Sequence, residues 1–257
     1  MSAAPARRAA AALAATLTLA ACSSGGAFNW GWHVVSPWTA QGWSNLGFLV
    51  EGYRWTIMAS LCAMVVSIVL GLAIALLAMS RWRAARVFTR GYVELLRSIP
   101  ILVMILWVFY GLPIVLGIRL DTFTAAVFAI AICDSAFEAE IFRGGIQSIE
   151  KGQHEAAESL GLSPWRKMRF VILPQAIRRI LPPLGNQFVY ITKITSLASV
   201  IGLGELTRKA NELNVTEFRP LEIYTVLVIE YLALILVISY LVRRLERRYG
   251  SDESQRR

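Results

Sequence analysis

Two acidic residues lie inside an apolar stretch of this chain, where ionised side chains need a partner. Asp134 and Glu138 are four residues apart, so a helix would place both carboxylates on one face. Charged groups in such stretches are costly to bury, and they usually face a cavity or another charge. The spacing predicts contact with the amino group of a small substrate or an ion pair with Lys193 from a later run. Glu140 and Arg143 are expected to pair with each other.

The residue types that usually carry catalysis or bind metals do not form a recognisable set. The two histidines, His33 and His154, stand alone, and the three cysteines lack a C-x-x-C spacing. The chain contains neither a G-x-x-x-x-G-K-[ST] phosphate loop nor an H-E-x-x-H zinc motif. We therefore expect no enzymatic activity, no metal and no cofactor in this chain, and no ATP site of its own.

A polar and basic stretch, HEAAESLGLSPWRKMRFVILPQA, follows the acidic run. Good helix formers over Lys151–Leu160 predict a helix, and Gly161 is typical of the residue that ends one. Ser163 suits the N-cap of a second short helix over about Trp165–Ile172, which Pro174 is expected to end or kink.

The first helix of this stretch carries small residues between two carboxylates. Ala156 and Ala157 allow another surface to approach closely, and Glu155 and Glu158 can pair with basic groups. The pattern fits a helix that docks in a cleft of another protein. It fits equally well an amphipathic hairpin at the membrane interface without a partner.

The composition indicates what must position these groups. Hydrophobic residues make up 56% of the 257 residues, which is too apolar for an ordinary soluble domain. The sequence predicts an all-α integral membrane protein with one transmembrane domain. Five runs approach the roughly 20 residues that a helix needs to cross a bilayer: Thr56–Ala78, Ile99–Leu116, Phe123–Ile141, Ile180–Ile201 and Leu221–Val242.

The net charge of +9 is distributed unevenly. Arginine and lysine gather after the first, third and fifth runs, and the alternate loops hold few of them. The positive-inside rule places these three segments in the cytoplasm, including the polar stretch and the tail 250–257. Nucleic acid is not an expected partner, because no soluble module combines a basic patch with stacking aromatic residues.

The N-terminus has its own pattern. Arg7 and Arg8 precede the short apolar run Ala9–Ala21, as in a signal peptide. The ending LAAC resembles a bacterial lipobox, with Cys22 as the residue to be lipidated; an uncleaved signal anchor is the alternative for residues 1–22. Either reading places the aromatic-rich segment 23–46 outside the membrane.

The fourth apolar run is rich in helix-breaking and polar residues. It contains Pro182 and Pro183, followed by Asn186, Gln187 and Lys193. Broken helices are tolerated in a membrane only where they line a cavity or pack on protein, and they recur at transport sites. We expect this run to be broken and to line the path of a substrate.

The polar stretch also carries a recognisable motif. Glu155-Ala156-Ala157, three residues, Gly161, nine residues and then Val171-Ile172-Leu173-Pro174 resembles the EAA loop of ABC importer permeases, with Val171 in place of isoleucine. Four further segments resemble the polar amino acid uptake branch of that family: ELLRSIPILVMILW, AEIFRGGIQSIEKGQHEAA, LPQAIRRILPPLGNQFV and KITSLASVIGLGEL. The resemblance covers residues 47 to 249, and the lipobox-like start lies outside it.

This resemblance implies a fold, a function and partners. The fold is the five-span type I importer permease, in the bacterial inner membrane, with an external N-terminus and a cytoplasmic C-terminus. A cytoplasmic ATPase dimer would bind ATP and magnesium and receive the coupling loop, about 151–174. A second permease, identical or related, and an external amino acid binding protein complete the assembly. The coupling residues would be Glu155, Ala156, Ala157, Ser159, Leu160 and Gly161.

The substrate expected from RSIPILVMILW, within the first of these segments, is glutamate or aspartate, although glutamine, arginine and histidine permeases share most of it. Two other classes stay open at this point. One is a secondary transporter, which the absence of repeated halves argues against. The other is a membrane-anchored lipoprotein or scaffold, for which five spans would make a lipid anchor redundant.

Overall fold

The structure is a computed structural model that describes residues 29–249. Three parts of the sequence predictions lie outside these residues: the signal-like segment with Cys22, the start of the aromatic segment and the tail 250–257. The chain divides into two units, Met1–Trp32 and His33–Arg257. In the described part of the first unit, the rings of Trp30 and Trp32 stack with their centroids 6.4 Å apart. The helical bundle belongs to the second unit.

The first long helix begins earlier than the sequence predicted. After the short turn η1 (Trp32–Val35), α2 (Ala40–Val50) leads into α3 (Gly52–Ala78). The Thr39 hydroxyl caps α2 by accepting a hydrogen bond from the Gly42 amide at 3.1 Å. Together α2 and α3 form an apolar helical stretch of 39 residues, long enough to cross a membrane. Part of the segment predicted as an external aromatic region is therefore helical.

The second expected span, Ile99–Leu116, is helical from Ile101 onward, and a sharp bend separates it from the helix before it. The basic segment after α3 is itself a helix, α4 (Arg83–Ser98), followed by α5 (Ile101–Leu106), the π turn η2 (Trp107–Gly111) and α6 (Leu112–Leu116). The chain bends by 98° between α4 and the α5–α6 segment. Pro100 explains the bend, because proline disfavours helical geometry at the preceding residue, and Ile99 has an extended ψ of 125°.

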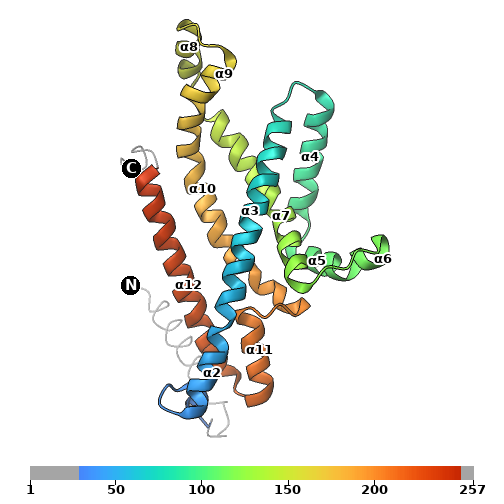
Figure 1. Ribbon diagram of the computed structural model, residues 1–257, viewed down its shortest axis with the longest axis vertical. Helices are drawn as coiled ribbons and strands as arrows, with labels where there is room; N and C mark the ends of the chain where they lie inside the picture. Colours follow the sequence, from blue (N-terminus) through green and yellow to red (C-terminus); the bar gives the residue numbers. More distant parts are fainter. Residues whose placement is uncertain (1–28, 250–257) are drawn as a thin grey trace, which may run out of the picture. The chain divides into compact units, whose positions relative to one another are not determined.

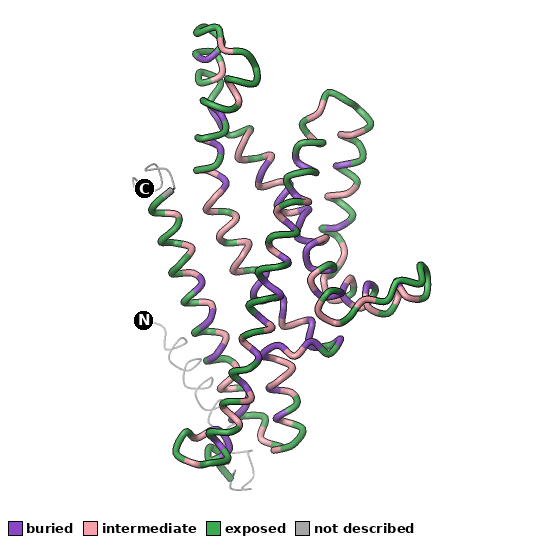
Figure 2. Tube along the Cα trace, viewed as in Figure 1, coloured by how far each residue is buried: buried purple, intermediate pink, exposed green. Residues whose placement is uncertain are grey.

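The third span is confirmed as a helix and is the most enclosed one. α7 (Thr122–Gln147) begins at Asp121, whose carboxylate accepts a hydrogen bond from the Thr124 amide at 3.2 Å. Its 26 residues measure about 39 Å, enough to cross a bilayer. α3 and α4 pack along it, as does α10 (Leu173–Ile194). Figure 2 shows its buried residues in the middle of the bundle.

The fourth span differs from the prediction at its prolines. α8 (Lys151–Ser159) and α9 (Pro164–Lys167) are followed by the π turn η3 (Met168–Ile172), α10 and the 3-10 segment η4 (Thr195–Ile201). Pro174 was expected to end or kink the helix, but the π turn widens it just ahead of the proline and the helix continues. α10 also runs unbroken through Pro182 and Pro183, so the expectation of a broken run is wrong there.

Two further helices complete the bundle. α11 (Leu206–Glu217) packs against α2, α3 and α12 (Pro220–Tyr249), and α12 packs along α10. By length and composition, two helices within residues 29–249 could each span a membrane alone. The number of candidate spans rises to as many as four when each bent pair of helices is counted as one span. α7 is not among these candidates, although its 26 residues are long enough to cross a bilayer.

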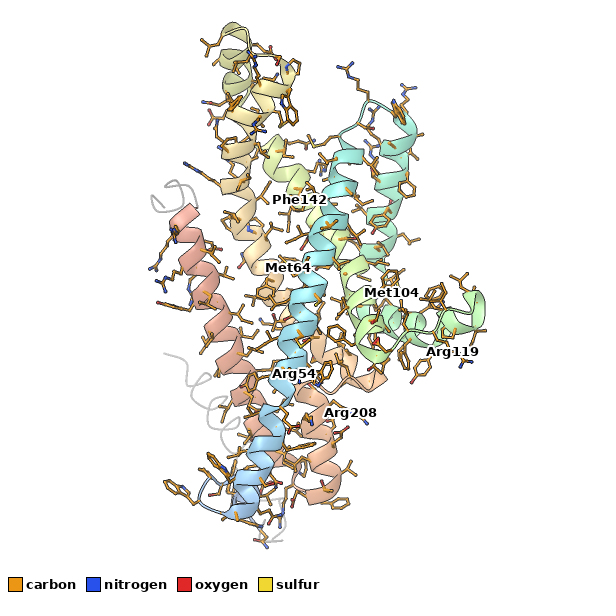
Figure 3. The ribbon with its side chains drawn as sticks, viewed as in Figure 1. Arg54, Met64, Met104, Arg119, Phe142 and Arg208 are labelled. Atoms are coloured by element: carbon orange, nitrogen blue, oxygen red, sulfur yellow. The ribbon has the colours of Figure 1, made fainter. Side chains whose placement is uncertain are left out.

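The apolar core is divided along the helices. One cluster joins Ile105, Ile130 and Ile191 with Met64 packed against it, and another joins Phe142, Ile172 and Ile180. Figure 3 shows Met64 and Phe142 at different levels of α3 and α7. Much apolar surface stays exposed on α3 and α12, as on Val65 (61%) and Val228 (65%), and this is what a lipid or protein environment requires.

Candidate functional site

The α8–α9 hairpin extends from one end of the bundle in Figure 1, and its turn is closed by a regular set of backbone hydrogen bonds. The Leu162 amide donates to the Ala157 carbonyl at 3.1 Å, and the Gly161 amide donates to Glu158 at 2.9 Å. These two bonds form a Schellman motif, in which the residue after the helix is left-handed. Gly161 has a φ of +71°, as expected of the residue that ends this helix.

The second half of the hairpin begins as predicted. The Ser163 hydroxyl accepts a hydrogen bond from the Arg166 amide at 3.4 Å, and Pro164 occupies the first turn of α9. Across the hairpin, the Lys167 ammonium contacts the Glu158 carboxylate at 2.6 Å. This hydrogen-bonded ion pair lowers the pKa of Glu158 below its usual value. The turn therefore has a defined shape, maintained by backbone and side chains together.

The hairpin presents one face outward and keeps one inward. Ala157 is 2% exposed and faces the bundle, where α8 lies against η3 and α9. Glu155, Ala156 and Ser159 are exposed on the other side. Leu160 is 79% exposed and Trp165 69%. A protruding helix with small residues and large apolar neighbours matches the shape of a docking element.

The acidic pair on α7 is buried, and its partners differ from those predicted. Asp134 accepts a hydrogen bond from the Gln187 amide group on α10. Glu138 accepts one from the Ser67 hydroxyl on α3 at 3.0 Å. One oxygen of each carboxyl group, Asp134 Oδ2 and Glu138 Oε2, has no hydrogen-bond donor within the described residues. The predicted ion pair with Lys193 is not formed, and this part of the prediction is corrected.

Lys193 and Asn186 lie on exposed faces of α10 instead. Lys193 makes no ion pair within residues 29–249 and borders a cavity of about 610 Å³ between the end of α10, η4 and α12. Thr207 and Tyr231 also line it. The candidate path residues thus separate into two sets. Asp134 and Glu138 are buried beside the half-buried Gln187, whereas Asn186 and Lys193 are exposed. The predicted pairing of Glu140 with Arg143 is confirmed at 2.5 Å.

A second buried polar cluster escaped sequence reasoning. Glu205 is fully buried, and its carboxylate accepts hydrogen bonds from the amides of Thr207 (2.9 Å) and Arg208 (2.7 Å) and from the Tyr231 hydroxyl (2.7 Å). It caps α11 and connects this helix to α12. Thr56 on α3 accepts a hydrogen bond from the Leu206 amide at 3.3 Å. A carboxylate directly ahead of a helix was the only signal in the sequence, because Tyr231 is 26 residues away.

Comparison with known proteins places this geometry in a family. Residues 39–251 match the family model described as the binding-protein-dependent transport system inner membrane component. The chain is 42% identical over 213 residues to the glutamine transport system permease protein GlnP of Escherichia coli (strain K12), covering 82% of this chain and 96% of the relative. It is 37% identical to the probable glutamine ABC transporter permease protein GlnM of Bacillus subtilis (strain 168), covering 80% and 96%.

A solved structure agrees with the sequence comparison. A chain from the crystal structure of an amino acid ABC transporter with histidines superposes with a TM-score of 0.76 at 38% identity, covering 80% of this chain and 95% of that one. The family match covers the helical bundle, and the α8–α9 hairpin lies within it. The chain therefore belongs to the binding-protein-dependent transport system inner membrane components, and it has the all-α membrane fold of type I ABC importer permeases.

Proposed function

We propose that this chain is the permease subunit of an ATP-driven importer of polar amino acids. The observation that carries the proposal is the α8–α9 hairpin, whose E-A-A and glycine positions are held by a Schellman motif with Gly161 at φ +71°. A hairpin of fixed shape is able to transmit movement from a docked partner to the helices that follow it. ATP and magnesium belong to the partner, and this chain contributes no chemistry of its own.

The partner at the hairpin is a cytoplasmic ATPase dimer. The exposed residues Ala156, Ser159 and Leu160 would enter a groove of that subunit, and Glu155 would contact its basic rim. The buried Ala157 would keep the helix seated on η3. A second permease subunit and an external binding protein complete the proposed assembly in the bacterial inner membrane. In this orientation the hairpin is cytoplasmic and the end that carries α2 and α11 is external.

Polar amino acids are the proposed substrates, with glutamine the first to test. Two curated relatives are named for glutamine transport, whereas the sequence alone had favoured glutamate or aspartate. Lys193 and the cavity beside it, together with the exposed Asn186, are the proposed contacts along the path. Asp134 and Glu138 are buried and Gln187 is half-buried, so the two carboxylates would reach a substrate only after the helices move apart.

The test uses the chain in its native bacterium. A tagged full-length chain purified from the membrane should bring an ABC ATPase with it, identified by mass spectrometry. Deleting the gene should remove uptake of radiolabelled glutamine, glutamate or aspartate, and restoring the wild-type gene should recover it. A purification without any ATPase, together with unchanged uptake of all three amino acids, would refute the proposal in favour of a secondary transporter or a scaffold.

A further inference from the structure

We propose that the end of the bundle near the α8–α9 hairpin contains a binding site for a phosphate group, separate from the path of the substrate. The site is a cavity of about 330 Å³ between α3, α4 and α7. Three arginines border it: Arg86 and Arg90 from α4 and Arg143 from α7. Glu140 is the one carboxylate in the lining, so three positive charges and one negative leave a net charge of +2.

Many N–H groups of these guanidinium groups remain available, as a count of donors shows. Each guanidinium has five N–H donors. Arg143 uses three, on both carboxylate oxygens of Glu140 and on Gln147. Arg86 uses the Nη1 group, on the carbonyls of Ser80 and Arg81. Arg90 has neither a hydrogen bond nor an ion pair within the described part of the chain.

Part of the cavity lining is apolar, which distinguishes the site from arginines that are merely solvated. Ile74 and Ala78 from α3, Val93 from α4 and Ala139 from α7 line the cavity together with the arginines. Guanidinium groups bind phosphate oxygens in pairs, and an apolar surface beside them strengthens such contacts by excluding water. Two helices, α4 and α7, supply the arginines.

A second cavity extends the first along α4. It has a volume of about 430 Å³, shares Arg90, Val93 and Glu140 with the first, and adds Arg97 and Glu94. An ester group attached to the phosphate therefore has room to continue toward the centre of the bundle. Basic pockets between membrane helices near the cytoplasmic surface accept lipid headgroups by the same chemistry. The phosphate would come from an anionic phospholipid or from a soluble phosphate ester.

The test measures binding and not transport, so it is independent of the proposed function. The full-length chain in a neutral detergent is heated with inorganic phosphate or with chloride at equal ionic strength. In parallel it is heated with short-chain phosphatidylglycerol or phosphatidylcholine in mixed micelles. The shift of the unfolding midpoint with ligand concentration gives an apparent Kd. We expect phosphate to raise the unfolding midpoint more than chloride does, or phosphatidylglycerol to raise it more than phosphatidylcholine does, or both. The comparison with the larger difference identifies the source of the phosphate group.

Variants at matched positions make the test specific. Arg90→Gln should raise the apparent Kd about tenfold, the effect of one lost charged hydrogen bond. Arg83→Gln removes the same charge from the exposed start of α4, outside both cavities, and should leave the Kd unchanged. Glu140→Gln should lower the Kd, because it removes the only carboxylate in the lining and releases Arg143.

Three outcomes would overturn the site. Equal stabilisation by phosphate and chloride, together with equal stabilisation by the two lipids, would mean that no phosphate is recognised. A loss of affinity in Arg83→Gln as large as in Arg90→Gln would reduce the effect to net charge. Free glutamate binding as tightly as phosphate would show a general carboxylate site. If Glu140→Gln fails to fold, as circular dichroism would show, the comparison of Arg90→Gln with Arg83→Gln still tests the site.

Discussion

The turn at Gly161 gives the most direct test of the hairpin, because backbone geometry is all that opposes a substitution there. A Cβ atom built at Gly161 meets nothing within 4 Å, yet φ is +71°. An L-residue held in this left-handed conformation costs about 1–2 kcal/mol. That energy changes a local equilibrium by about 5–30-fold. Valine should be at the upper end because β-branched residues tolerate positive φ least.

The substitution series separates backbone strain from side-chain bulk. Gly161→Val should open the turn, whereas Gly161→Asn should be close to wild type because asparagine is tolerated at positive φ. Gly152→Ala is the matched control in α8. Gly152 does not have a positive φ, and a Cβ atom built there meets nothing within 4 Å. The buried Ala157, 2% exposed, offers a second perturbation, since Ala157→Trp should displace α8 from η3.

The assay is substrate-stimulated ATP hydrolysis by the native complex in liposomes, together with crosslinking from Ser159→Cys to the ATPase. We expect Gly161→Val and Ala157→Trp to lose stimulation and crosslinking, while the chain still inserts and Gly161→Asn and Gly152→Ala keep both. Full transport by Gly161→Val would show that the turn geometry is not needed. Equal losses in Gly161→Val and Gly161→Asn would show that strain is not the cause.

Four further predictions concern other parts of the chain. A reporter fused after Arg83 or Arg248 should be cytoplasmic and one at Gly117 external, since arginine gathers in the first two segments; a cytoplasmic Gly117 would contradict the five-span map. Cys22→Ala should abolish palmitate labelling and leave a larger precursor; an unlabelled wild type would leave only a signal anchor. Gln187→Leu should destabilise the protein by about 1–3 kcal/mol by leaving buried Asp134 without its donor, and the exposed Asn186→Leu should not; equal melting of the two would rule this out. The lowered pKa of Glu158 means that its pair with Lys167 stabilises the hairpin above the usual glutamate pKa and is lost on acidification. Amide exchange in α8, corrected for intrinsic rates, should therefore rise as the pH falls, and a flat profile would show that the pair contributes nothing.

The sequence predicted best the features that depend on neighbouring residues. Gly161 and Ser163 have the conformations expected of them, because helix ends are set by local hydrogen bonds. Pro174 shows the limit of local reasoning: a proline usually ends a helix, but here a π turn over Met168–Ile172 comes directly before it and the helix continues.

Contacts between distant helices could not be read from the pattern. The four-residue spacing of Asp134 and Glu138 predicted a shared face correctly, but nothing local indicated that Gln187 and Ser67 would be their donors. Lys193 is the only cation inside a predicted run, so charge alone made it the expected partner. The structure instead uses neutral donors from α10 and α3, and Lys193 is left on an exposed face. The arginine cavity likewise requires three helices to be placed together.

The continuous helix after the hairpin explains how the two parts of the candidate site would act on each other. From Pro164 the chain stays helical to Ile201, and 23 residues at 1.5 Å separate Pro164 from Gln187, about 35 Å. A π turn alters the local winding but leaves no flexible loop between them. A displacement of the hairpin by its partner would therefore be felt at the Gln187–Asp134 hydrogen bond. We propose that loss of this bond accompanies the opening of the path, because the buried Asp134 carboxylate becomes accessible only when the helices separate.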